Sequence, residues 1–230
     1  HLFIQYNDQV SDRNLLSKNM EDWGWLKLIQ NANNSTEYDK IIVITYNYDI
    51  FLERLLSLKH IPYSVGGLEE DAEKIILLKP HGSISFTHNK LGDPSTFAIR
   101  KSGDMYEASL SDFIVKYDGL DKNYLVNALI PPAGDSSRLT YKWANELRAL
   151  VDNQINEISD NDKCVISGLS YWHVDRKEID SLLAKISVKN VDAYMVNPHP
   201  PKALSAVLTC VLPKHITYSS SKWIGGLIDG

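Results

Sequence analysis

The sequence of 230 residues predicts an α/β protein: a Rossmann-like layered fold with a mainly parallel sheet and a small inserted lobe. Short apolar runs rich in β-branched residues are each bounded by polar residues, as in strands buried on both faces of a parallel sheet. Segments with apolar residues at helical spacing alternate with these runs. This alternation is the pattern of parallel β-α-β units.

In the first half of the chain, the clearest strand is the run Ile-Ile-Val-Ile at residues 41–44. A partly amphipathic helical pattern over residues 10–36 precedes it, and a helix reaching about Lys59 follows. A second buried strand is expected at residues 74–79. Residues 84–128 show short alternating segments and turn residues without long periodicity, and we interpret them as the inserted lobe.

In the second half, apolar residues at helical spacing predict a long helix over about 138–158. A third strand is expected at residues 163–167, a helix at 175–185 and a fourth strand at 193–196. We expect the whole chain, residues 1–230, to form one domain.

Composition and charge exclude several classes of protein. The formal net charge is −5 and the lysines are scattered, so the sequence does not favour direct nucleic-acid binding. No apolar run approaches the roughly 18 residues of a membrane span, and no signal-peptide pattern opens the chain. We therefore expect a cytoplasmic protein without a membrane partner.

The two cysteines, Cys164 and Cys210, are far apart in the sequence. Two thiolates cannot complete a four-cysteine zinc site, and Cys164 lies in an apolar run, where a structural thiol is expected. We predict neither structural zinc nor a disulfide framework.

Polar residues or glycines follow each predicted strand at the point where it ends. They are Asn47, Asp49, His81, Gly82, Gly168, Ser170 and Asn197. Taken singly, each has a structural explanation as a turn former, a helix cap or a loop residue. Because the carboxyl ends of parallel strands share one edge of a sheet, the set favours a ligand-binding crevice at that edge.

These turns resemble the ordered motifs of the sirtuin-like superfamily. Thr45-Tyr46-Asn47-Tyr48-Asp49 resembles its T-x-N-x-D motif, and Lys79-Pro80-His81-Gly82-Ser83 resembles its K-x-H-G-S segment. Ile130-Pro131-Pro132, Gly168-Leu169-Ser170 and Val196-Asn197-Pro198 follow in the expected order. The set covers about residues 40–200 and is most similar to the sirtuin-like NAD⁺-hydrolysing domain of bacterial anti-phage defence proteins.

The resemblance implies that NAD⁺ is the substrate and that the bond between nicotinamide and ribose is broken. The products are nicotinamide and either ADP-ribose or a cyclic form. Asn47 and His81 would be catalytic: Asn47 would orient the nicotinamide ribose or an attacking water, and His81 would touch the ribose hydroxyls. The residues implied in cofactor binding are Thr45, Asp49, Gly82, Ser83, Gly168, Ser170 and Asn197. A homo-oligomer or an activating partner protein would control such an effector.

The sequence departs from this family in two ways. It lacks the paired Cys-x-x-Cys motifs of zinc-binding sirtuins, which disfavours protein deacylation. Residues 1–46 contain no G-A-G-x-S phosphate loop; Gly24 stands alone in a helical pattern. Either the phosphate-loop segment precedes this chain in a longer protein, or it has been lost. In the second case the chain would be a catalytically inactive NAD⁺- or ADP-ribose-binding module, or a protein-interaction module.

Overall fold

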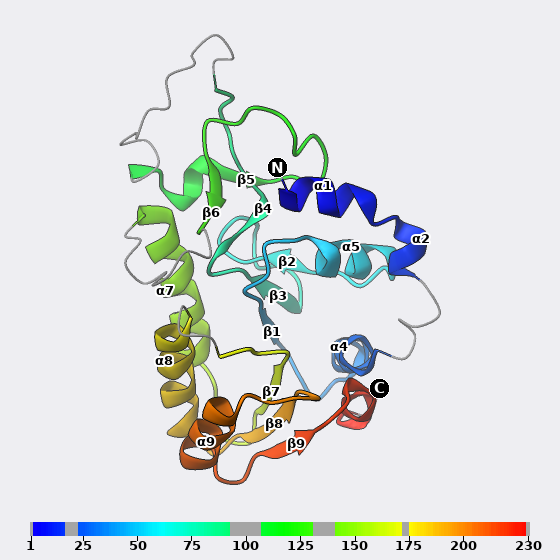
Figure 1. Ribbon diagram of the computed structural model, residues 1–230, viewed down its shortest axis with the longest axis vertical. Coiled ribbons are helices and arrows are strands. Elements are labelled where there is room, and N and C mark those ends of the chain that lie inside the picture. Colours follow the sequence, from blue (N-terminus) through cyan, green and yellow to red (C-terminus); the bar gives the residue numbers. More distant parts are fainter. Residues whose placement is uncertain (1, 17–22, 93–106, 131–140, 172–174, 229–230) are drawn as a thin grey trace. The chain divides into compact units, whose positions relative to one another are not determined.

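The computed structural model describes residues 2–16, 23–92, 107–130, 141–171 and 175–228 (Figure 1). The chain divides into two compact units. The first unit comprises His1–Met20, Tyr38–Pro131 and Leu139–Val151. The second comprises Glu21–Glu37, Pro132–Arg138 and Asp152–Gly230.

The first unit contains a parallel sheet of three short strands. They are β1 (Ile41–Ile44), β2 (Ser64–Val65) and β3 (Ile75–Leu78), in the order β1-β3-β2. All residues of the central strand β3 are buried, whereas β1 is only half-buried. The expectation that residues 41–44 form a strand buried on both faces is therefore wrong in its burial. Within the described residues, β1 lies at the edge of its sheet and pairs with β3 alone.

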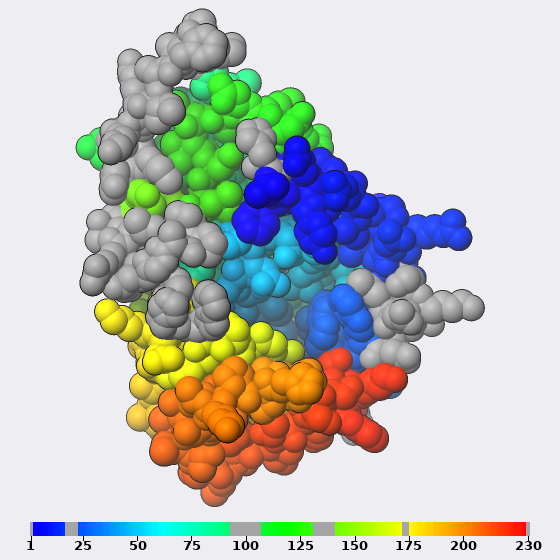
Figure 2. Space-filling model, in the orientation of Figure 1, coloured from blue at the N-terminus to red at the C-terminus, as the bar shows by residue number. Residues whose placement is uncertain are grey.

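Helix α5 (Phe51–Leu58) follows β1 directly, as the sequence predicts. Two short helices, α1 (Leu2–Gln9) and α2 (Asp12–Leu15), are connected to it by Arg54. The Arg54 guanidinium donates hydrogen bonds to the backbone carbonyl of Asn7, in α1, to that of Val10, between the two helices, and to the carboxylate of Asp12, at the start of α2. Helix α1 lies on the outer surface of this unit (dark blue in Figure 2), with Leu2 and Tyr6 exposed.

An antiparallel sheet completes the first unit. Its strands are β4 (Gly82–His88), β5 (Phe113–Val115) and β6 (Asn127–Leu129), in the order β5-β4-β6, with a short 3-10 helix η1 (Leu110–Asp112) before β5. The two ends of the segment interpreted as an inserted lobe, residues 84–128, lie in β4 and β6, and η1 and β5 lie within it. Whether that segment is a separate lobe stays a prediction, because residues 93–106 lie outside the described part.

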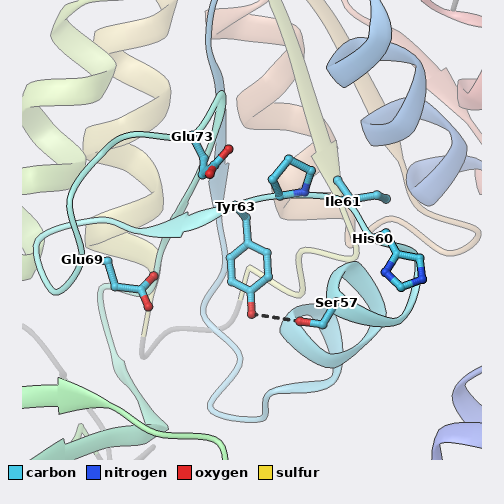
Figure 3. A pocket seen from close by; sticks show the side chains of 7 residues that line it. Ser57, His60, Ile61, Tyr63, Glu69 and Glu73 are labelled. Carbon is cyan, nitrogen blue, oxygen red and sulfur yellow. Dashed lines mark hydrogen bonds between the residues drawn. The ribbon is translucent and has the colours of Figure 1, made fainter.

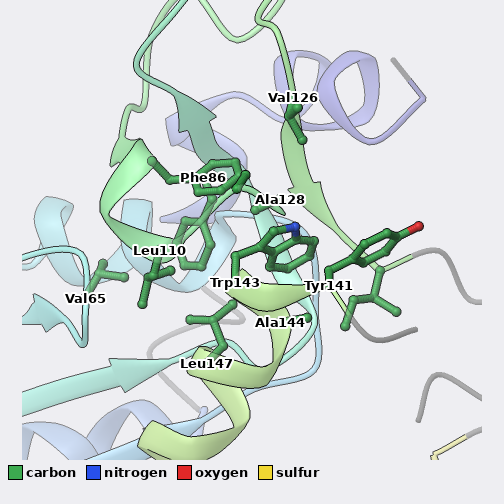
Figure 4. Packing of buried hydrophobic residues seen from close by; sticks show 12 residues of the cluster. Val65, Phe86, Leu110, Val126, Ala128, Tyr141, Trp143, Ala144 and Leu147 are labelled. Carbon is green, nitrogen blue, oxygen red and sulfur yellow. The ribbon is translucent and has the colours of Figure 1, made fainter. Parts of the chain in front are cut away.

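The main apolar core of this unit joins the antiparallel sheet to helix α7 (Lys142–Asn156). Figure 4 shows Trp143, which is 0% exposed, among Phe86, Leu110 and Leu147. The Tyr141 ring stacks on it at a centroid distance of 5.6 Å. The predicted helix over 138–158 is thus present, although residues 138–140 lie outside the described part.

The second unit holds another parallel sheet. Its strands are β7 (Lys163–Ser167), β8 (Asp192–Val196) and β9 (Ile216–Tyr218), in the order β7-β8-β9. Helix α8 (Arg176–Ser187) connects the first two strands, and α9 (Lys202–Val211) connects the last two. The sequence predicted β7, α8 and β8 but did not identify α9 and β9.

Helix α4 (Gly24–Asn34) and the 3-10 helix η3 (Ser221–Gly226) pack closely in this unit. A Cβ atom added to Gly24 would lie 1.5 Å from the carbonyl oxygen of Ser221. The side-chain amide of Asn31 donates to the carbonyls of Gly225 and Ile228. Gly24 therefore allows a close helix contact, which accounts for a glycine inside a helical pattern.

The architecture is mixed α/β with small parallel sheets. The parallel strands of the described residues belong to two three-stranded sheets, where the sequence predicted one mainly parallel sheet. None of the helices in the described ranges combines the length and apolar character that a membrane span requires.

Candidate functional site

The turn after β1 carries Asn47 on an exposed position. The backbone N–H of Asn47 donates to the Thr45 hydroxyl at 3.2 Å. The Asp49 carboxylate accepts a hydrogen bond of 3.1 Å from the backbone N–H of Phe51, at the first residue of α5. Asp49 therefore fixes the start of the helix that follows the Asn47 turn.

The turn after β3 depends on a glycine. The backbone N–H of Gly82 donates to the carbonyl of Lys79 at 2.9 Å, and Gly82 has φ of +79°. A Cβ atom added there would lie 1.8 Å from the carbonyl oxygen of Ala128. Only glycine satisfies both the left-handed conformation and the close contact between β4 and β6.

This turn brings His81 against the Asn47 turn. The His81 side chain is buried, with the residue 3% exposed. Its ring meets the Tyr46 ring edge-on at a centroid distance of 4.8 Å and lies nearly parallel to the Tyr48 ring at 6.4 Å. The two predicted catalytic segments are therefore neighbours within the first unit, and the two tyrosines form the contact.

Ser83 supports the same turn from inside the unit. Its hydroxyl donates to the backbone carbonyl of Tyr48 at 3.2 Å and accepts from the Ser85 hydroxyl at 2.9 Å. Ser83 is 0% exposed. These bonds give Ser83 a structural role, and its part in binding a cofactor stays a prediction.

A buried ion pair lies beneath the Asn47 turn. The ammonium of Lys79 contacts the Glu53 carboxylate at 2.7 Å, and both side chains are 1% exposed. Lys79 also donates to the backbone carbonyl of Asp49. Burial raises the pKa of the Glu53 carboxyl, and the Lys79 ammonium opposes part of that rise.

The sequence reasoning missed this pair, although a signal was present. Glu53 lies three residues after Ile50 and three before Leu56, so a carboxylate occupies the apolar face of a helix. Ile50 and Leu56 are both buried. A charged residue on such a face requires a partner.

The predicted site residues of the second unit also come together. Gly168 has φ of +65°, and a Cβ atom added to it would meet no described atom within 4 Å. The side-chain amide of Asn197 donates to the carbonyl of Leu169 at 3.3 Å, and its oxygen accepts from the backbone N–H of His199. Ser170 is exposed. Asn197 thus connects the ends of β7 and β8.

Two parts of the predicted site stay untested. The meeting of all the strand-end turns in one crevice is still a prediction, since the turns belong to different units. Pro131 and Pro132 of the family motif lie outside the described residues.

A hollow of about 380 Å³ lies elsewhere in the first unit, and Figure 3 shows the side chains that line it. It is lined by Ser57, His60, Ile61, Pro62, Tyr63, Glu69 and Glu73. The hollow contains none of the predicted site residues. Its carboxylates, Glu69 and Glu73, would repel the phosphates of a nucleotide. We therefore do not regard this hollow as the NAD⁺ site.

The described residues contain no group of three or more His, Cys, Asp and Glu side chains that could hold a metal ion. No protein-family model matches the sequence, and no curated protein matches it.

Proposed function

We propose that the protein is an NAD⁺ glycohydrolase, which cleaves the bond between nicotinamide and ribose. The products would be nicotinamide and ADP-ribose or a cyclic form. One observation carries the proposal: the Asn47 turn and His81, which match the two catalytic motifs, pack against each other through Tyr46 and Tyr48.

The reaction suits these side chains. Nicotinamide leaves as a neutral group, so positive charge develops on the ribose in the transition state. A histidine that assists proton transfer contributes typically about 10²–10⁴-fold. An exposed asparagine amide can orient the ribose or a water molecule but cannot act as a base.

The burial of His81 adds a requirement. Because this residue is 3% exposed, its ring would reach a ribose only after Tyr46 or Tyr48 moves. The proposed catalytic state therefore includes a rearrangement of these aromatic rings, such as substrate binding can induce.

The proposal also gives the remaining predicted residues a part in NAD⁺ binding. A Cβ atom at the exposed Gly168 would meet no described atom within 4 Å, so a phosphate or ribose could approach the backbone there. Ser170 and Asn197 would bind the same part of the nucleotide. The proposal also includes a Rossmann-like layering of the parallel strands, which the alternation of strands and helices favours, and a cytoplasmic location. An effector role in prokaryotic defence and control by oligomerisation or a partner rest on the family resemblance.

The test is release of nicotinamide from NAD⁺, followed by chromatography. We expect the His81→Ala and Asn47→Ala variants to lose at least about 100-fold of the wild-type rate. His60→Ala, in the hollow, and Asn145→Ala, on an exposed face of α7, are the matched controls and should retain the rate. Undiminished cleavage by His81→Ala would refute the mechanism.

A second candidate is a module that binds NAD⁺ or ADP-ribose without cleaving it. The enclosure of His81 favours this candidate, because a buried ring cannot touch a substrate. Calorimetry that detects NAD⁺ binding, together with unchanged NAD⁺ after long incubation, would establish it.

A further inference from the structure

We infer that Lys79 is a positioning residue: its buried ammonium holds the Asn47–Asp49 turn in a fixed place relative to His81. The catalytic part of this inference rests on the proposed function. The structural part, which concerns the order of the turn, can be tested without it.

Lys79 belongs to both predicted catalytic segments through different atoms. Its backbone carbonyl accepts the hydrogen bond that closes the turn containing His81. Its side-chain ammonium donates to the backbone carbonyl of Asp49, in the other turn. The same ammonium pairs with Glu53 at 2.7 Å, on the first turn of α5. One side chain thus joins both turns and the helix that follows the first.

The chemistry of the contact makes it directional and strong. A hydrogen bond from a charged donor to a carbonyl is about twice as strong as one between neutral groups. The contact is also shielded from water, since Lys79 and Glu53 are each 1% exposed. Such a bond restricts the Asp49 backbone, two residues from Asn47.

A gain in folding stability is a poor explanation for the buried Lys79–Glu53 ion pair. Buried ion pairs are often matched or exceeded in stability by apolar residues of similar volume. Here the second oxygen of Glu53 is buried and has no hydrogen-bond partner among the described atoms. An incompletely satisfied carboxylate carries a desolvation cost, so a contribution to site geometry is the better reason for this pair.

The decisive variant is Lys79→Met/Glu53→Met, which removes both charges and keeps side chains of similar length. We expect it to retain the wild-type thermal midpoint, because no uncompensated charge is left buried. With the Asp49 carbonyl no longer held by Lys79, the Asn47 turn should lose its fixed position, and kcat for nicotinamide release should fall by about 100-fold while KM changes little. Backbone amides of residues 46–49 should exchange faster with deuterium, as measured by mass spectrometry.

The matched control is Lys185→Met/Asp152→Leu. This ion pair has an N–O distance of 2.5 Å and half-exposed side chains, and both residues belong to the second unit. The control should change neither kcat nor exchange at residues 46–49.

The outcomes separate the inference from the proposed function. Unchanged kcat in the methionine variant of an active wild type overturns the inference. If the wild-type protein releases no nicotinamide, the proposed function fails, and deuterium exchange alone tests the positioning role. Faster exchange at residues 46–49 in the methionine variant supports that role, and unchanged exchange overturns it. If the methionine variant does not fold, Lys79→Gln/Glu53→Gln, which keeps a neutral hydrogen bond, is measured with the same two criteria.

Discussion

Glu53 occupies a position where burial and charge oppose each other. Burial raises the pKa of its carboxyl above the usual value of 4.5, and the contact with Lys79 compensates only in part. A carboxyl with a raised pKa in the folded state holds its proton more tightly there than in the unfolded chain. Its contribution to stability is therefore complete below about pH 4.5 and is lost as the pH rises through the raised pKa.

The Glu53→Gln variant tests this dependence. We expect the free energy of unfolding of the wild type, relative to Glu53→Gln, to decrease as the pH rises from about 4.5 and then to level off. The decrease should be about 1.4 kcal/mol for each unit by which the folded-state pKa exceeds the usual value. Urea unfolding between about pH 4 and pH 8 measures it. The exposed Glu70→Gln is the control, and a relative stability that rises with pH would contradict the assignment.

At the scale of the elements, Gly82 and Gly168 each lie in the turn that follows a parallel strand: Gly82 begins β4 after the turn from β3, and Gly168 directly follows β7. Both have positive φ, of +79° and +65°. Their surroundings differ, because the Ala128 carbonyl lies close to Gly82, whereas a Cβ atom at Gly168 would meet no described atom within 4 Å. At Gly82, glycine is required because β4 and β6 pack closely there. At Gly168, glycine is favoured only because the backbone has a positive φ.

Alanine substitutions should separate these two effects. Gly168→Ala is expected to cost about 1–2 kcal/mol of unfolding free energy, the strain of an L-residue in the left-handed region. Gly82→Ala should cost at least twice as much, because β4 and β6 must also separate. Urea unfolding compares the two variants. Equal losses would show that the contact with Ala128 is not a constraint.

At the scale of the whole molecule, each unit presents a parallel sheet whose strands end in turns with predicted ligand-binding residues. Under the proposed function, Asn197 of the second unit is one of the residues that bind the nucleotide. A ligand that binds only the folded chain raises its stability, and residues that contact the ligand determine how much.

ADP-ribose, which cannot undergo the proposed cleavage, is the appropriate probe. At roughly 100 times its Kd, we expect it to stabilise the full chain by about 2.7 kcal/mol. Thermal unfolding across a series of ADP-ribose concentrations measures the effect. The shift should be weaker in Asn197→Ala and unchanged in Asn190→Ala, an exposed asparagine. If ADP-ribose raised the unfolding temperature equally in both variants, Asn197 would not be part of the binding site.

The sequence by itself determined the elements with strong local patterns. The apolar runs at 41–44 and 163–167 are β1 and β7, and the helical spacing after 138 is α7. The spacing of apolar residues in strands and helices depends only on residues close together in the sequence, so these elements can be predicted without a structure. The residues 202–218, which form α9 and β9, were not recognised.

Only the tertiary structure decided which strands pair and which side chains meet. It placed β1 at an edge, grouped the parallel strands into two sheets, and packed His81 against Tyr46. It also paired Lys79 with Glu53, although the sequence showed merely a charge on an apolar helix face. These contacts join residues far apart along the chain, so they depend on how the elements pack, which local periodicity does not encode.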